Sequence, residues 1–292
     1  MYNTIEDLLE EQRRTGEPLH RIILKNEMEL SELSEEEIYS GLKKRYEVMA
    51  ASAGKALQQP QKMVLGLIEG QASRQRQYVD GQSICGPFLN ELMAMALSCS
   101  EVNASMGRIC AAPTAGSCGI LPAVLLAVSR RYGSSEKEVL SALLVAGGFG
   151  AVIVKNSTVS GAEGGCQAEC GAAAAMAAAA AVTLAGGTAE MAANACGIAL
   201  MNVMGLVCDP VAGLVQLPCS YRNASGAVNA VLSADLALAG QSSVIPADQC
   251  IDAMYRVGKK LPMELRETAL GGIASQPAGK AYAKQLREIG RI

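Results

Sequence analysis

The chain has 292 residues, half of them apolar, and a formal net charge of −3. No stretch concentrates lysine and arginine, so nothing indicates a nucleic-acid partner. The N-terminus lacks the basic start and apolar run of a secretory signal. The uncharged apolar stretch between Glu138 and Lys155, residues 139–154, is shorter than the roughly 20 residues that span a membrane. We therefore expect a cytoplasmic protein with no membrane segment.

Residues 1–80 hold 25 of the 53 charged side chains. Within them, Ser34 and Glu37 have the spacing of a capping box, and Ile38 and Leu42 follow at helical spacing. This pattern predicts an amphipathic helix with its charged face in water. We interpret residues 1–80 as a charged helical region of the same domain as the rest of the chain, without chemistry of its own.

Residues 81–292 form the second predicted region, an apolar helical core. Only nine charged side chains lie in residues 139–255, and period-2 alternation is scarce. Residues 151–154 could form a strand, but they stand alone. With no Trp, two Phe and 30 Gly, we predict an all-α fold whose helices pack through small residues and are joined by glycine-rich loops. The expected helices are 121–131, 135–146, 171–184, 189–207, 224–239 and 246–258.

Three of the ten cysteines differ from the rest, which lie mostly on apolar helical faces. Cys166 ends a glycine-rich loop, Cys208 is expected to end a helix, and Cys219 is expected in the loop that follows. Free backbone N–H groups at such junctions stabilise thiolates. In a reducing compartment cysteines are buried small side chains or metal ligands more often than disulfides. The residues alone leave both interpretations open, a metal site and buried structural cysteines.

The spacing of these cysteines, with 41 residues and then ten between them, is similar to the cluster-binding pattern of bacterial iron–sulfur L-serine dehydratases. Further matching segments are Asn-Ala-Ser-Met-Gly-Arg at 103–108, the stretches 112–119, 160–163, 208–213 and 222–224, and Ala-Leu-Gly-Gly-Ile-Ala at 269–274. That family occurs as one fused chain or as two subunits. This chain resembles the separate catalytic α chain.

The resemblance implies a 4Fe–4S cluster held by Cys166, Cys208 and Cys219. Three thiolates leave one of the four irons without a protein ligand, and an open metal position acts as a Lewis acid. It implies a lyase of amino-acid degradation and gluconeogenesis, in which the hydroxyl of L-serine binds that iron, a base removes the Cα proton, and pyruvate and ammonia form. It also implies a β chain, in a heterodimer or larger assembly.

The loop 114–119, Thr-Ala-Gly-Ser-Cys-Gly, precedes a predicted helix. Its N–H groups could bind the substrate carboxylate, with Thr114, Gly116 and Ser117 as the contacts. Its glycines could instead serve a close crossing of two helices. Both interpretations stay open at this stage.

Two more polar positions allow alternatives. Asn156 follows an apolar run and Lys155; it could face the substrate or belong to a loop returning to water. Arg222 could hold a carboxylate or a cluster sulfur, or it could be a buried side chain paired with Asp209 or Glu163.

The single histidine, His20, lies among charged residues of the N-terminal region, and we interpret it as a surface residue. No histidine base is then available in the core. The base would be a carboxylate such as Glu163, a lysine such as Lys155, or a group on the second chain. Cys170 would share a helical face with Cys166, but the family pattern does not require it as a ligand.

Two other functions remain open from the sequence. One is a cysteine desulfidase-type lyase on the same scaffold, which releases sulfide instead of water. The other is a non-catalytic iron–sulfur sensor or structural subunit. A pyridoxal-phosphate serine dehydratase is disfavoured, because Lys155 lacks the Ser-x-Lys-x-Arg-Gly context of a Schiff-base lysine.

Overall fold

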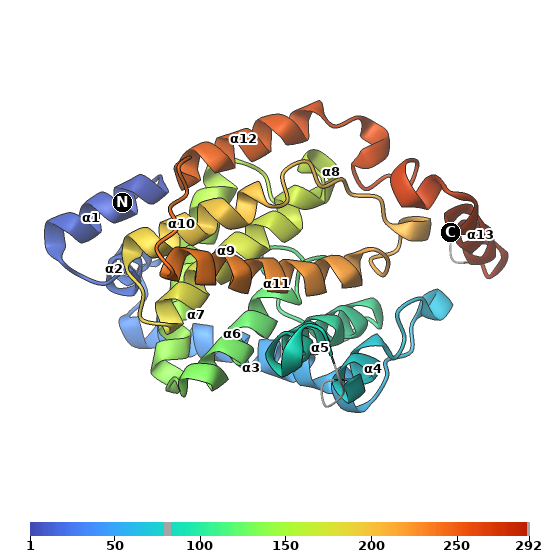
Figure 1. Ribbon diagram of the computed structural model, residues 1–292, viewed down its shortest axis with the longest axis horizontal. Coiled ribbons are helices and arrows are strands. Elements are labelled where there is room, and N and C mark those ends of the chain that lie inside the picture. Colours follow the sequence, from blue (N-terminus) through green and yellow to red (C-terminus); the bar gives the residue numbers. More distant parts are fainter. Residues whose placement is uncertain (79–82, 291–292) are drawn as a thin grey trace.

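The computed structural model describes residues 1–78 and 83–290, and in these residues it is helical without any β-sheet (Figure 1). The predicted all-α fold is confirmed. The predicted region boundary between residues 80 and 81 lies outside the described residues. The α-helices are α1 (Ile5–Thr15), α2 (Leu19–Ser31), α3 (Glu35–Gln58), α4 (Gln71–Tyr78), α5 (Gly86–Ala104), α6 (Ile120–Tyr132), α7 (Glu136–Asn156), α8 (Gly161–Gly164), α9 (Ala172–Leu184), α10 (Ala189–Met201), α11 (Cys219–Leu238), α12 (Ala247–Lys260) and α13 (Pro277–Glu288). Shorter turns are η1 (Val64–Gly66), η2 (Gln167–Gly171), η3 (Val211–Gly213), η4 (Met263–Leu265) and η5 (Gly272–Ser275).

Both predicted capping boxes are present. At the start of α3 the Glu37 amide donates to Ser34 Oγ at 3.2 Å, and the Ser34 amide donates to Glu37 Oε2 at 2.9 Å. The same reciprocal pair joins Ser135 and Glu138 at the start of α7. Each pair satisfies N–H groups that the first turn of a helix leaves free, which explains why local sequence located these ends correctly.

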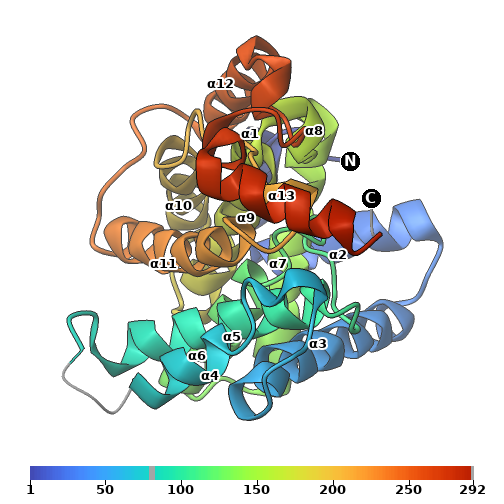
Figure 2. The same cartoon turned by 90° about the vertical axis from the view of Figure 1, so that its right-hand side faces the viewer.

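The alanine-rich helix α9 is the centre of the molecule, with α6, α7, α10 and α11 packed around it (Figures 1 and 2). All its residues from Ala172 to Val182 are buried. Small side chains allow its neighbours to approach closely: a Cβ on Gly150 of α7 would lie 2.8 Å from Met176. The predicted packing through small residues is confirmed, and the helices around α9 are closely packed against it.

Helix α7 is longer than predicted and continues to Asn156, so the possible strand at 151–154 is wrong. Val152 and Ile153 are buried on the helix face that packs inward, and no neighbouring strand exists in the described residues to pair with them. Burial, rather than strand pairing, accounts for the β-branched residues at this position.

Two other helix ends also differ from expectation. Helix α10 ends at Met201 instead of 207, and Gly205 then adopts a left-handed φ of +86° that ends helical geometry. Gly258 lies inside α12 rather than at its end. A Cβ there would lie 2.7 Å from the Cα of Gly164, so glycine allows α12 to cross α8.

Two helical stretches are long and apolar enough to span a membrane, Glu136–Asn156 and Gln167–Leu184. The first contains residues 139–154, the apolar stretch that we expected to be too short to span a membrane. The fold buries 72% and 89% of their apolar windows. Their composition is that of core helices.

Candidate active site

Cys166, Cys208 and Cys219 come from three separate segments and meet near the N-terminal end of α9. Cys166 directly precedes η2, a π-helical turn that continues into α9, and Cys219 is the first residue of α11. Burial, and after it the charge on the neighbouring Cys166, raises the pKa of both other thiols. The segment between α10 and α11, which contains Cys208, leads to the start of α11 and is gold in Figure 1.

Cys208 does not end a helix, and Cys219 is not in a loop, so both local predictions are wrong. Cys208 forms an isolated parallel bridge with Arg266. Its amide donates to the Leu265 carbonyl at 2.8 Å, and its carbonyl accepts from the Glu267 amide at 2.7 Å. A segment almost sixty positions later in the chain therefore positions Cys208, which local sequence patterns cannot reveal.

The structure brings a fourth cysteine to the group. Cys170 is buried, and its Sγ lies 3.4 Å from Cys166 Sγ. The π-helical turn between them widens the backbone, and such turns are frequent at functional sites. The hydrogen bond with Cys170, with the positive charge of Arg222, lowers the pKa of Cys166.

The other two thiols are shifted in the opposite direction. Burial raises the pKa of Cys219 to about 12 and also raises that of Cys208. Both are therefore protonated near neutral pH unless a bound cation stabilises the thiolate, which is how a metal displaces the proton from a cysteine ligand.

The chemistry of the donor set fits thiolate ligation of an iron–sulfur cluster. In the described residues, no three His, Cys, Asp or Glu side chains surround one metal-ion position. Cluster thiolates bind different irons, so they do not converge on one point. A group of buried cysteines without histidine matches the thiolate ligation that such clusters prefer.

Arg222 forms a buried ion pair with Asp209, one of the two alternatives left open by the sequence. Its Nη2 donates to Asp209 Oδ1 at 2.7 Å and its Nη1 to the Val207 carbonyl at 2.8 Å. Asp209 Oδ2 also accepts from the Ile273 amide at 2.8 Å. The pair thereby joins the start of α11, the Cys208 segment and the Gly-Gly-Ile stretch near the C-terminus into one unit.

The loop 114–119 lies against the same site. Thr114 Oγ1 is 3.1 Å from Ser117 Oγ, and Ser117 is fully buried. Asn223 of α11 accepts from the Gly119 amide at 2.8 Å and donates to the Gly116 carbonyl at 2.7 Å. Asn223 thus fixes the loop relative to Cys219, whose carbonyl it also binds at 2.8 Å.

The glycines of this loop serve different purposes. A Cβ on Gly119 would lie 2.4 Å from the Ala96 carbonyl oxygen, so this position allows a close approach to α5. A Cβ on Gly116 would instead lie 3.0 Å from Glu169 Oε1. The crossing interpretation therefore holds for Gly119, while Gly116 faces the site.

Glu169 is the residue that sequence reasoning missed. It lies on η2, accepts from Thr114 Oγ1 at 2.8 Å, and its Oε2 is 3.9 Å from Cys208 Sγ. Burial raises its pKa, against the hydrogen bond from Thr114 that lowers it. The available signal was an isolated charge in the long apolar stretch between Glu163 and Glu190.

The two sequence candidates for the base are on the surface. Lys155 Nζ binds the side chain of Asn3, and Asn156 Nδ2 donates to the Asn3 carbonyl at 2.7 Å. Glu163 is exposed on α8, and within the described residues its side chain forms no hydrogen bond or ion pair. The structure does not bring Lys155 or Asn156 into contact with the cysteines, and the roles proposed for these three residues stay predictions.

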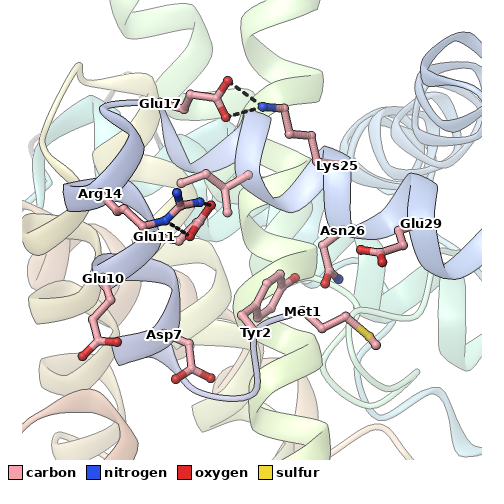
Figure 3. A pocket seen from close by; sticks show the side chains of 11 residues that line it. Met1, Tyr2, Asp7, Glu10, Glu11, Arg14, Glu17, Lys25, Asn26 and Glu29 are labelled. Atoms are coloured by element: carbon pink, nitrogen blue, oxygen red, sulfur yellow. Dashed lines mark hydrogen bonds and ion pairs between the residues drawn. The ribbon is translucent and has the colours of Figure 1, made fainter.

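His20, expected at the surface, is half-buried on α2, and burial lowers its pKa. A cavity of about 400 Å³ that His20 does not line lies on α1 and α2 (Figure 3). Part of its charged lining is paired internally, with Lys25 to Glu17 at 2.6 Å and Arg14 to Glu11 at 2.5 Å, while Asp7, Glu10 and Glu29 also line it. It contains none of the predicted site residues, so we do not assign the chemistry to it.

Comparison with known proteins identifies similar chains. Residues 14–274 match the family described as serine dehydratase alpha chain. The L-serine dehydratase, alpha chain, of Peptoniphilus asaccharolyticus is 48% identical over 99% of this chain and all of its own length. The probable L-serine dehydratase, alpha chain, of Bacillus subtilis is 43% identical over 98% of this chain and 95% of its own. L-serine dehydratase 2 of Escherichia coli is 36% identical over 94% of this chain, but only 61% of its own length is covered.

Proposed function

This chain belongs to the serine dehydratase alpha chain family, and from that membership we propose that it is the catalytic α chain of an L-serine dehydratase. The reaction is that of a lyase, which converts L-serine to pyruvate and ammonia. The observation that carries the proposal is the meeting of three buried or half-buried cysteines with the loop 114–119, in a chain that matches L-serine dehydratase α chains over nearly its whole length.

We propose that Cys166, Cys208 and Cys219 hold a 4Fe–4S cluster. Their separation in the chain, the burial of Cys166 and Cys208, the partial burial of Cys219 and the absence of histidine beside them in the described residues support this assignment. When bound, such a cluster supplies a Lewis-acidic iron that makes a hydroxyl a better leaving group.

The surrounding residues of the chain hold and orient the reactants. We propose that the loop with Thr114, Gly116 and Ser117 binds the substrate carboxylate through its backbone N–H groups, because the Thr114 hydroxyl donates to Glu169 and Ser117 is fully buried. Arg222 has both terminal nitrogens engaged by Val207 and Asp209. We therefore propose that it acts by positioning the Cys208 segment, with its charge near the thiolates, rather than by direct contact with substrate.

The decisive experiment compares two products from the protein purified without air. We expect pyruvate from L-serine, with little sulfide from L-cysteine. Sulfide as the main product would favour the desulfidase alternative. A protein that holds iron and sulfide but turns over neither amino acid, even with its partner chain, would favour a sensor or structural subunit.

We also propose a β-chain partner. The similar alpha chains are named as one chain of an enzyme, and the Escherichia coli relative has further sequence beyond the part that matches. Helix α11, which begins with Cys219, exposes the apolar side chains of Tyr221, Leu232 and Leu236. This exposed face starts at the proposed site, so a chain that covers it would also close that site to water.

The partner prediction is tested by reconstituting the α chain with iron and sulfide and measuring L-serine turnover with and without the β chain. If the β chain supplies the proton-transferring group, its addition should raise the rate by roughly 100-fold or more. Equal rates in the two samples would contradict the prediction and return the search for the base to this chain.

A further inference from the structure

We propose that Glu169 binds the α-ammonium group of the amino-acid substrate and thereby makes the site specific for amino acids over hydroxy acids. This inference rests on the proposed function, because it assigns a further contact of the same site. It concerns substrate recognition, and does not require Glu169 to exchange a proton.

The position of Glu169 carries the inference. Its Oε1 accepts from Thr114 Oγ1 at 2.8 Å, which ties it to the loop proposed for the substrate carboxylate. Its Oε2 lies 3.9 Å from Cys208 Sγ, which ties it to the proposed cluster ligands. Glu169 is therefore the described carboxylate that bridges these two parts of the site.

Two glycines allow the backbone to approach the carboxylate of Glu169 closely. A Cβ on Gly161 would lie 2.5 Å from Glu169 Oε2 and 3.1 Å from Cys208 Sγ. A Cβ on Gly116 would lie 3.0 Å from Glu169 Oε1. The backbone therefore comes close to both carboxylate oxygens, at positions where a larger residue would collide with them.

The charge of Glu169 lacks a cationic partner within the described part of the chain. No lysine, arginine or histidine there forms an ion pair with it, and the nearby guanidinium of Arg222 is paired with Asp209. Glu267 adds a second negative charge close by. Because a buried carboxylate is costly without a compensating cation, this region is suited to a small positively charged group.

An amino-acid substrate provides that group. An ammonium carries three N–H donors, and one carboxylate oxygen of Glu169 remains without a close donor beyond the weak thiol contact of Cys208. L-Serine would then be held at three points: its hydroxyl on the cluster side, its carboxylate at the loop 114–119, and its ammonium at Glu169. Three fixed points define the orientation of the Cα–H bond, which a stereospecific elimination needs.

The test uses the cluster-loaded enzyme with its partner chain and the variant Glu169→Gln. Because a hydrogen bond to a charged group is lost, we expect the KM for L-serine to rise roughly 10- to 100-fold. Two ligands that do not eliminate provide a binding readout by calorimetry. L-Alanine keeps the ammonium and lacks the hydroxyl, whereas L-glycerate keeps the hydroxyl and lacks the ammonium.

We expect Glu169→Gln to weaken L-alanine binding by a similar factor and to leave L-glycerate binding unchanged, with iron content as in the wild type. Glu169→Asp, which keeps the charge, should be intermediate. The matched control is Glu190→Gln, which removes an exposed carboxylate from the first turn of α10 and should change neither ligand.

Equal weakening of both ligands, or an unchanged KM, would overturn the inference. If Glu169→Gln loses iron, the test rests on Glu169→Asp. A ratio of L-alanine affinity to L-glycerate affinity equal to that of the wild type would then overturn the inference. A wild-type enzyme that does not turn over L-serine would instead contradict the proposed function itself, so the two failures are distinguishable.

Discussion

Serine in place of Cys166, Cys208 or Cys219 should leave a folded protein without its iron and sulfide and with L-serine turnover reduced by more than about 100-fold. The reason is chemical: a hydroxyl is far less acidic than a thiol and is a poor ligand for iron in a cluster. Mutation of residues that only hydrogen-bond to metal ligands already reduces metal affinity or activity roughly 10- to 100-fold. Iron and sulfide content, visible absorbance and pyruvate formation measure the effect.

The matched controls use cysteines away from the site. Cys85→Ser changes an exposed thiol, and Cys196→Ala changes one that is fully buried in the core. Both variants should keep their iron and their activity. A Cys219→Ser protein with a full complement of iron would show that the ligand assignment is wrong, and Cys170, 3.4 Å from Cys166, would then be tested first.

Arg222→Met should lower the free energy of unfolding by roughly 3–5 kcal/mol and reduce iron retention. The side chains of Arg222 and Asp209 are only 15% and 4% exposed, and removal of one partner from a buried pair leaves an uncompensated charge. The change also frees the Val207 carbonyl, which loosens the segment that carries Cys208. Denaturant unfolding measures the stability, and iron analysis measures the second effect.

Two further variants distinguish the loss of this buried ion pair from the mere removal of a positive charge. Arg256→Met removes a partner from an exposed pair with Asp252 and should not change stability measurably. The double variant Arg222→Met, Asp209→Asn should recover part of the lost stability, since the unpaired charge is gone while the Ile273 amide keeps an acceptor. A stability unchanged by Arg222→Met alone would mean that the pair does not hold these segments together.

Local sequence determined the helices whose ends and faces depend on neighbouring residues. The capping boxes at Ser34 and Ser135 were correct because each satisfies free N–H groups within one turn. Helix α6 was correct to within one residue at each end, from Ile120 to Tyr132. The family resemblance carried in the motifs around Cys166, Cys208 and Cys219 led to the same family that the comparisons show.

Tertiary contacts decided what local sequence got wrong or missed. Cys208 is placed by Leu265 and Glu267, and the start of α11 at Cys219 is tied to the loop 114–119 through Asn223. Glu169 is connected to the loop 114–119 by a hydrogen bond from Thr114, which lies 55 positions earlier in the chain. Helical periodicity and capping report on residues within a few positions of one another. A site built where distant segments meet is decided by the packing around α9, and no pattern within one segment contains that information.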